Sequence, residues 1–165
     1  MRQLTDEQFE IIVNKFSKTL FSIAFNYTRD RYHSEDIVQE TFFKLYRTHK
    51  DFENEEHLKY WLIRVTINNS LDVIRKKQKE MLIDDEYVNN FPDNTELDSD
   101  KGQIFSCILE LKESYKTIII LHYYDNYSIK EIASILNISE TNALTRLNRA
   151  RVKLKNIIIE RKNNE

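Results

Sequence analysis

The chain has 165 residues, a net charge of −2, and only one Gly, one Pro and one Cys. So few turn-forming residues, beside many Ile, Leu, Lys, Glu and Asn residues, predict an all-α protein and exclude most sheet folds. The single Cys107 excludes an internal disulfide, no Cys or His residues have the spacing of a zinc site, and we expect neither a metal nor a cofactor. No apolar run is long enough for a signal peptide or a membrane span, which predicts a soluble cytoplasmic protein.

The charge pattern divides the chain into three parts. Residues 1–80 carry a net charge of +1, residues 81–102 carry −6, and residues 103–165 carry +3. We therefore expect two small helical domains, 1–80 and 103–165, joined by a flexible acidic linker, 81–102, which also contains the only Pro and the only Gly. The alternative for the linker is an acidic segment that docks in a basic channel.

The first domain is predicted to contain a helix from Ser34 to His49, with Ser34 as its N-cap. Its inward face is expected to hold Ile37, Val38, Thr41, Phe42, Leu45 and Tyr46. Its outward face is expected to hold Asp36, Gln39, Glu40, Phe43 and Arg47. An exposed Phe beside acids and a Gln favours a protein interface. The alternative is that Phe43 packs against a neighbouring helix.

A second helix is predicted from His57 to Lys79, after a loop at residues 50–56. Its buried stripe is expected to contain Ile63, Ile67, Ser70, Leu71 and Ile74, and its polar face Tyr60, Arg64, Asn68, Asp72, Arg75 and Lys79. Tyr60 and Trp61 lie beside Lys59 and Arg64, and this combination of aromatic rings and positive charge is typical of surfaces that bind unpaired bases. The alternative for Trp61 is a core anchor. We expect Asp72 to pair within the helix, with Arg75 or Lys76.

The second domain is predicted to contain a helix-turn-helix. Residues 128–131 have the form of a capping box, Asn137 suits a left-handed turn, and Ser139 can cap the next helix. Apolar residues recur on that helix at Ala143, Leu147, Ala150, Leu154 and Ile157, opposite a polar row of Asn142, Arg146, Arg149 and Lys153. A second helix with Asn and Arg on one face suits the major groove of DNA. The alternative is a packed helical hairpin with a solvated basic face.

Basic residues cluster at 75–79 and 146–155, and such clusters are typical of phosphate binding. The whole chain is nevertheless slightly acidic, with a pI near 6.1. Counterion release alone would therefore hold DNA only weakly. This mismatch predicts a DNA-reading protein that a larger partner delivers.

The two halves together resemble regions 2 and 4 of the bacterial sigma-70 family of transcription initiation factors. The first block consists of residues 36–42 (DIVQETF), Phe52, residues 61–64 (WLIR), Asn68, Asp72 and Arg75. The second block is EIASILNISETNALTRLNRARVKL, residues 131–154. The short connection between the blocks resembles the smallest branch, the extracytoplasmic-function (ECF) sigma factors.

The resemblance implies a polymerase-binding factor that is not an enzyme, with sites for core RNA polymerase and for two promoter elements. The β′ clamp helices of polymerase would bind Asp36, Gln39, Glu40 and Phe43. The melted −10 strand would contact the loop at 50–56 together with Lys59, Tyr60, Trp61, Arg64, Asn68 and Arg75. The duplex −35 element would contact Ser139, Thr141, Asn142, Thr145, Arg146 and Arg149.

The resemblance also implies three further contacts of the whole protein. The second domain would bind the β flap of polymerase, and the acidic linker would thread the nucleic-acid channels of the enzyme. A membrane-linked anti-sigma factor would hold the protein silent, while the chain itself would not insert in a membrane.

Two departures from the family pattern affect the second domain. A usual Leu-Pro pair is here Leu111-Lys112, so the helix that follows is expected to begin differently. A usual Thr-Val-Lys is here Asn142-Ala143-Leu144, which removes a phosphate-binding Lys and leaves Leu144 to contact a thymine methyl group or to extend the core.

The alternative function is a stand-alone helix-turn-helix regulator that binds its operator without polymerase. A purely protein-binding helical adaptor would leave Asn142, Arg146 and Arg149 without an explanation.

Overall fold

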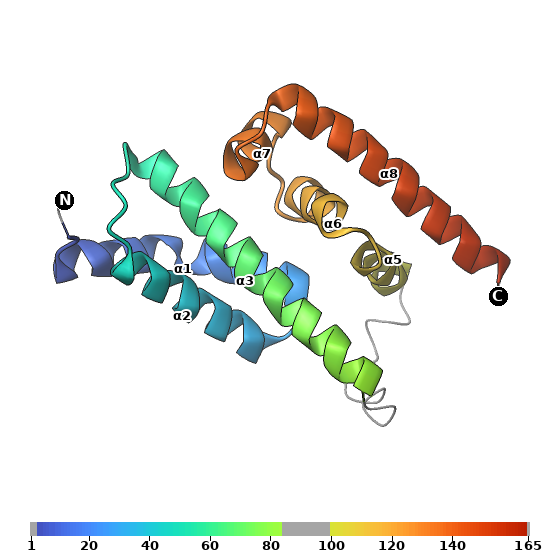
Figure 1. The fold of residues 1–165 in the computed structure, drawn as a ribbon, viewed down its shortest axis with the longest axis horizontal. Helices are drawn as coiled ribbons and strands as arrows, with labels where there is room; N and C mark the ends of the chain where they lie inside the picture. The colour runs from blue at the N-terminus through green and yellow to red at the C-terminus, as the bar shows by residue number, and fades with distance from the viewer. Residues whose placement is uncertain (1–2, 84–99, 165) are drawn as a thin grey trace. The chain divides into compact units, whose positions relative to one another are not determined.

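The computed structural model describes residues 3–83 and 100–164, which form helices and connecting turns and contain no strand. The prediction of an all-α protein is confirmed. The chain divides into two compact units, Met1–Ile83 and Asp84–Glu165 (Figure 1). Most of the predicted acidic linker, residues 84–99, lies outside the described residues. The domain boundaries at 80/81 and 102/103 stay predictions.

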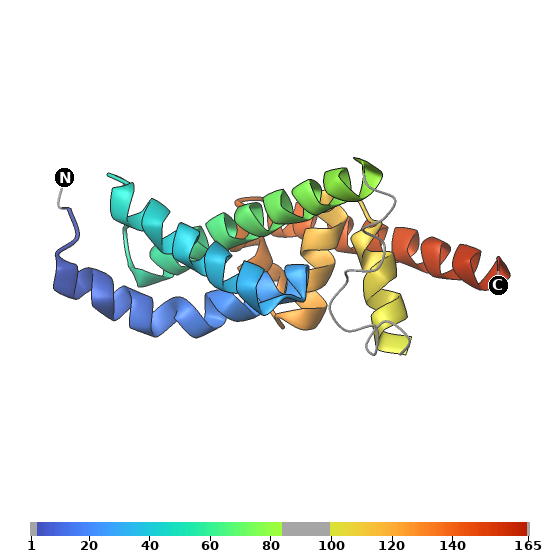
Figure 2. The ribbon, with the colours of Figure 1, turned by 90° about the horizontal axis from the view of Figure 1, so that it is seen from below.

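Three long helices form the first unit: α1 (Asp6–Thr28), α2 (Arg31–Arg47) and α3 (Glu55–Ile83). They lie side by side and each contacts the other two (Figures 1 and 2). Their apolar faces form one core, which contains Leu20, Ile23, Tyr27, Ile37, Leu45, Leu62 and Ile63. Burying one such side chain contributes roughly 1.5–3 kcal/mol, so this core stabilises the unit.

The start of α2 differs from the prediction. Asp30, not Ser34, is the N-cap, and its carboxylate accepts a hydrogen bond of 2.9 Å from the backbone N–H of His33. Ser34 lies inside the helix and is fully buried. Both residue types cap helices well. Arg29 ends α1 in the left-handed conformation, and the N-cap of α2 follows directly after it, four residues before Ser34. The prediction that Ser34 caps this helix is therefore wrong.

The predicted inward face of α2 is buried at Ile37, Val38, Thr41, Phe42 and Leu45. Tyr46 is an error in that list, because half of it (50 %) is exposed. Its ring packs in a T-shaped arrangement with the ring of Phe9 from α1, with centroids 5.4 Å apart. At this end of α2, therefore, α1 covers one side of the tyrosine and leaves the other open.

Buried polar side chains join α2 to α3. The hydroxyl groups of Thr41 and Thr66 lie 3.2 Å apart, and the Asn69 amide donates to Thr41 over 3.3 Å. Lys44 then donates to the Asn69 carbonyl oxygen over 2.6 Å. Thr66 and Asn69 were absent from the predicted stripe, whereas Ile63, Ile67, Ser70 and Leu71 are buried as predicted and Ile74 only partly. Since buried polar groups need their partners, this contact allows one register of the two helices.

The second unit is built around a buried central helix. Its elements are α5 (Asp100–Leu109), α6 (Glu113–Ile119), the π-helical turn η2 (Ile120–Tyr124), α7 (Ile129–Leu136) and α8 (Glu140–Asn163). The long helix α8 contacts α5, α6 and α7. The central helix is α6. The aliphatic run Ile118–Leu121, where α6 continues into η2, is almost completely buried because neighbouring helices pack against it.

The helix-turn-helix of α7 and α8 is confirmed. Ser128 and Glu131 cap each other in both directions, over 3.1 and 2.9 Å. Asn137 ends α7 in the left-handed conformation (φ 56°, ψ 48°), and the Ser139 hydroxyl accepts from the Asn142 N–H over 3.0 Å. The facing apolar residues Ile132, Ile135, Ala143, Leu147 and Ala150 are buried.

Both departures from the family pattern have a structural outcome. Helix α6 begins at Glu113, with Lys112 in the N-cap position and no side-chain cap bond. Leu111 is buried before it. Leu144 is 48 % exposed, so it does not extend the core of its unit.

Candidate protein and nucleic-acid interfaces

The outward face of α2 is exposed as predicted. Asp36, Gln39, Glu40 and Phe43 are all exposed. Phe43 is 47 % exposed. The Arg47 guanidinium lies over its ring, 4.0 Å from the ring centroid. The exposed face of α2 therefore combines an aromatic ring, two acids and an amide, and it is called here the candidate docking patch.

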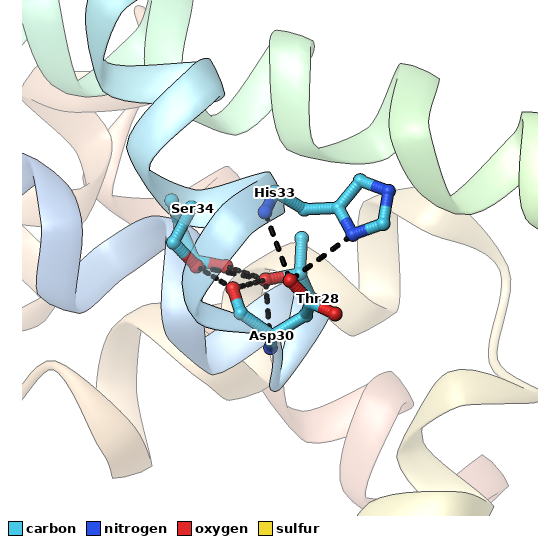
Figure 3. A network of polar contacts seen from close by, with 5 residues as sticks. Thr28, Asp30, His33 and Ser34 are labelled. Atoms are coloured by element: carbon cyan, nitrogen blue, oxygen red, sulfur yellow. Dashed lines mark hydrogen bonds and ion pairs between the residues drawn. The ribbon is translucent and has the colours of Figure 1, made fainter. Parts of the chain in front are cut away.

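A polar network at the corner between α1 and α2 holds the start of this helix (Figure 3). The Thr28 and Ser34 hydroxyl groups lie 2.9 Å apart, and Ser34 donates to the Asp30 carbonyl oxygen over 2.6 Å. Thr28 also donates to the Ala24 carbonyl, over 3.1 Å. The corner thereby ties the last turn of α1 to the first turn of α2. Asp36, the first residue of the docking patch, lies within the second turn of α2.

The Asp30 carboxylate carries the charge of this corner. Partial burial raises its pKa, but the hydrogen bond from the His33 N–H and the charges of His33 and Lys77 outweigh that effect. The pKa of Asp30 consequently lies below its ordinary value. The ionised form is favoured in the folded protein, as expected for an acid at a helix N-terminus.

The second surface follows α3 from its first turn. Lys59, Tyr60, Trp61 and Arg64 are partly buried, whereas Asn68 and Arg75 are exposed. All six predicted −10 residues lie on this helix, and the distance along its axis from the first to the last is about 24 Å at 1.5 Å per residue. At about 100° per residue, Tyr60, Trp61, Arg64, Asn68 and Arg75 share one side of the helix and form a stripe, whereas Lys59 lies on the opposite side from Asn68.

Aromatic and ionic contacts modify this stripe. Trp61 packs edge-on against Phe52 of the preceding loop, with centroids 5.4 Å apart, yet keeps part of its surface exposed. Trp61 is therefore partly packed, as the core-anchor alternative expects, and partly accessible, as a base-binding role requires. Arg75 forms the predicted ion pair with Asp72, at 2.5 Å. That pair reduces the positive charge Arg75 presents.

The same loop lines a hollow of about 450 Å³ that the sequence did not indicate. Its walls come from α1, the end of α2 and the start of α3, and include Ile11, Phe16, Tyr46 and Phe52. Lys15 and Glu55 form an ion pair at its rim. The hollow depends on three segments distant in sequence, so no local pattern announces it.

The third surface is the exposed face of α8. Thr141, Asn142, Thr145 and Arg149 are exposed and Arg146 is partly buried, while Ser139 serves as the N-cap. Arg146 and Arg149 form no ion pair or hydrogen bond with any residue in 3–83 or 100–164. No acid occurs between Glu140 and Glu160. This face therefore presents uncompensated positive charge.

Arg151, in the same basic cluster, behaves differently. It donates to the Tyr123 hydroxyl over 2.5 Å and to Asn148 over 3.2 Å, and its guanidinium lies 5.5 Å from the Tyr123 ring centroid. These contacts hold it against η2. The structure thus distinguishes Arg146 and Arg149, which have no partner among the described residues, from Arg151, which binds Tyr123. Helical spacing alone did not make this distinction.

The described residues contain no group of acids, His and Cys able to hold a metal ion. Among the same residues, no helix combines the length and the apolar character needed to cross a membrane.

The two units define a class: an all-α protein with an exposed face of mixed aromatic, acidic and amide side chains in one unit and a helix-turn-helix in the other. Comparison with family models agrees with both parts. The model of sigma-70 region 2 matches residues 12–80, and that of sigma-70 region 4 matches residues 101–154.

Two relatives from Bacillus subtilis (strain 168) align over nearly the whole chain. The ECF RNA polymerase sigma factor SigM is 31 % identical over 156 residues, covering 91 % of this chain and 92 % of that protein. The RNA polymerase sigma factor SigV is 28 % identical over 149 residues, 90 % of each chain. The protein belongs to the ECF sigma factors of the sigma-70 family.

Two solved structures share the fold. The sigma factor RpoE of Bartonella quintana, in complex with the anti-sigma factor NepR, has a TM-score of 0.62 at 23 % identity and covers 92 % of this chain and 97 % of its own. CnrH, in complex with the cytosolic domain of CnrY, has a TM-score of 0.66 at 21 % identity and covers 94 % of this chain and 90 % of its own.

A charge-only change at the α1–α2 corner tests the role of Asp30. Asp30→Asn keeps a capping side chain but removes the charge, so we expect a loss of about 0.3–1 kcal/mol of unfolding free energy at pH 7. Because the folded-state pKa is lowered, this stabilisation is complete above the unfolded pKa of about 3.9 and disappears as the pH falls through the folded value. Urea unfolding at pH 7 and below pH 3 measures the difference.

Asp36→Asn, an exposed acid on the same helix, is the control and should show a smaller difference at pH 7. If the unfolding free energies of wild type and Asp30→Asn differ by the same amount at both pH values, the charge interpretation is refuted.

Proposed function

We propose that this sigma factor binds core RNA polymerase through α2, contacts the melted −10 strand through α3, and reads the −35 duplex through α8. One observation carries the proposal: the exposed mixed patch of α2 and the uncompensated basic row of α8 lie in two separate compact units. A protein that joins polymerase to two DNA elements needs several separate surfaces of this kind. We further propose that it works in the cytoplasm and catalyses no bond change.

The α2 patch has the composition of a protein interface. Phe43 provides an aromatic anchor, and Gln39 and Glu40 supply polar contacts around it. By family resemblance, the partner is the pair of β′ clamp helices. The Arg47 guanidinium, 4.0 Å from the centroid of the Phe43 ring, adds a positive charge beside this anchor.

The α3 stripe suits an unpaired strand. Trp61 and Phe52 offer aromatic surface beside Lys59 and Arg64, and exposed Asn68 offers an amide for a base edge. A melted strand could follow the helix toward the basic residues 75–79.

The α8 row suits a duplex. Asn142 and Arg146 lie in the first two turns of the helix, where recognition helices contact bases, and Arg149 follows one turn later. Arg pairs with guanine and Asn with adenine, each through two hydrogen bonds.

Other partners follow from the family. We propose that the β flap binds the second unit and that the acidic segment 81–102 enters the nucleic-acid channels of polymerase, where its charge of −6 would resemble that of a nucleic acid. The solved relatives RpoE and CnrH are bound to NepR and CnrY. We propose that an anti-sigma factor likewise silences this protein.

The test of the function is whether DNA binding depends on polymerase. The free chain is net acidic, so we expect only weak, salt-sensitive duplex binding, with a Kd of roughly 10⁻⁴–10⁻⁶ M at physiological salt. Specific binding should appear with core enzyme. A mobility-shift assay on a promoter selected by run-off transcription from a random library measures this at matched salt. Nanomolar specific binding by the free protein would instead favour the stand-alone regulator.

The docking patch predicts a loss of affinity for core polymerase that is separate from any effect on DNA binding. The double variant Gln39→Ala/Phe43→Ala should weaken binding to core polymerase by about 1–3 kcal/mol, because it removes the anchor and an adjacent polar contact. Fluorescence anisotropy with labelled protein measures the affinity, and circular dichroism verifies the fold. Ile11→Ala, the control, removes an exposed apolar side chain from α1 (59 % exposed, against 47 % for Phe43) and should leave the affinity unchanged. Unaltered affinity of a folded double variant would rule out this patch.

The two DNA surfaces predict different defects. Arg146→Ala and Arg149→Ala should each weaken promoters that depend on −35 by about 1–3 kcal/mol, whereas Asn68→Ala should impair opening at −10. Permanganate footprinting on duplex and on pre-melted −10 templates separates the two. Pre-melting should rescue Asn68→Ala and not the Arg variants. Equal rescue of all three would contradict the division.

A further inference from the structure

A hollow of about 210 Å³ lies between the start of α6 and the exposed face of α8. Three of its lining residues, Lys112, Ser114 and Tyr115, come from the α6 end. The other four come from α8: Asn142, Thr145, Arg146 and Arg149. The predicted −35 surface contained the α8 residues only, so the α6 residues extend it onto a second helix.

The chemistry of the lining restricts the occupant. Every one of the seven side chains can donate a hydrogen bond: three are cationic, three carry a hydroxyl group and one carries an amide. None of the lining residues is an acid. Three like charges around one hollow repel one another unless an anion lies between them. The best occupant is therefore a small anionic group rich in acceptor oxygens, such as a phosphate.

The cations of the hollow are available for such a group. Arg146 and Arg149 have no ion pair in the described part of the chain, and Lys112 makes no cap bond with its side chain. Arg151, outside the hollow, is held by Tyr123 instead. Three cations without an ion pair among the described residues, Lys112, Arg146 and Arg149, therefore line the same hollow as the hydroxyl groups of Ser114 and Tyr115.

We infer that Lys112, Ser114 and Tyr115 complete, with Arg146 and Arg149, a seat for one backbone phosphate of the −35 duplex. The inference rests on the proposed function, because it needs α8 in the major groove. A helix in that groove lies between two phosphate backbones, and a neighbouring helix that reaches one of them sets the register of base contacts. Lys112 supplies a cation at the position where the family pattern has Pro, in a chain that lacks the usual Lys at position 144.

The first test is the salt dependence of holoenzyme binding to a −35-dependent promoter. Lys112→Gln removes one positive charge. It breaks no capping hydrogen bond, because the Lys112 side chain makes none. Each lost phosphate contact lowers the slope of log Kd against log salt by about 0.9, so the affinity gap to wild type should narrow about threefold between 50 and 200 mM salt. The loss should be the same on consensus and altered −35 sequences, since phosphate contacts carry no base preference. Lys155→Gln, an exposed charge of α8 outside the hollow, should leave the slope unchanged.

The second test locates the phosphate. Promoters carrying one neutral methylphosphonate at a time along −35 are bound to wild-type and Lys112→Gln holoenzyme. One position should weaken the wild type more than the variant, because Lys112→Gln has already removed one of the contacts to that phosphate while Arg146 and Arg149 keep theirs.

Absence of any such coupled position, with Arg146→Ala still selectively weakening −35 recognition, overturns the phosphate seat and leaves the proposed function intact. A holoenzyme that ignores the −35 sequence altogether overturns both.

Discussion

The hydrogen-bonded contact of Thr41 with Thr66 and Asn69 is the constraint on which the first unit depends. It is buried between α2 and α3, so sliding or rotating either helix would leave polar groups without partners in an apolar environment. The apolar core would tolerate small shifts, but this contact does not. With one face of α2 held in place, the opposite face must carry Asp36, Gln39, Glu40 and Phe43 to the surface. The docking patch is a consequence of what the helix buries.

In the second unit, function follows from which cations have partners. Arg151 is bound to Tyr123, and Arg161 to Glu110 and Ser106, so both stabilise the unit. Arg146 and Arg149 remain uncompensated on the same helix. One side of this basic helix therefore contacts η2 and α5, and the other side presents the positive charge that we propose binds phosphate. The overall charge of −2 conceals this division, and it is the basis of the expectation that the free chain holds DNA only weakly.

The departures from the family pattern belong to one surface. Leu144, 48 % exposed near the start of α8, offers an apolar contact where the usual Lys would offer charge. Lys112 places a charge at the start of α6 instead, beside Arg146 and Arg149. Compared with the family pattern, the chain lacks a Lys near the start of α8 and has an additional Lys at the start of α6. Such a shift preserves attraction to the backbone while changing which groups face the bases, so the −35 preference of this chain need not follow that of its relatives.

Sequence by itself determined the features whose contacts are local. The capping box of Ser128 and Glu131, the left-handed Asn137 and the Ser139 cap all involve residues within four positions of one another, so propensity and spacing specified them. Helical periodicity likewise gave the exposed patch of α2. Only the tertiary structure decided between Asp30 and Ser34 as the cap, both of them locally suitable, because packing at the α1–α2 corner buries Ser34. The pairing of Lys112 with Arg146 around one hollow, and of Arg151 with Tyr123, joins residues about thirty positions apart, and no local pattern encodes a contact that packing between helices creates.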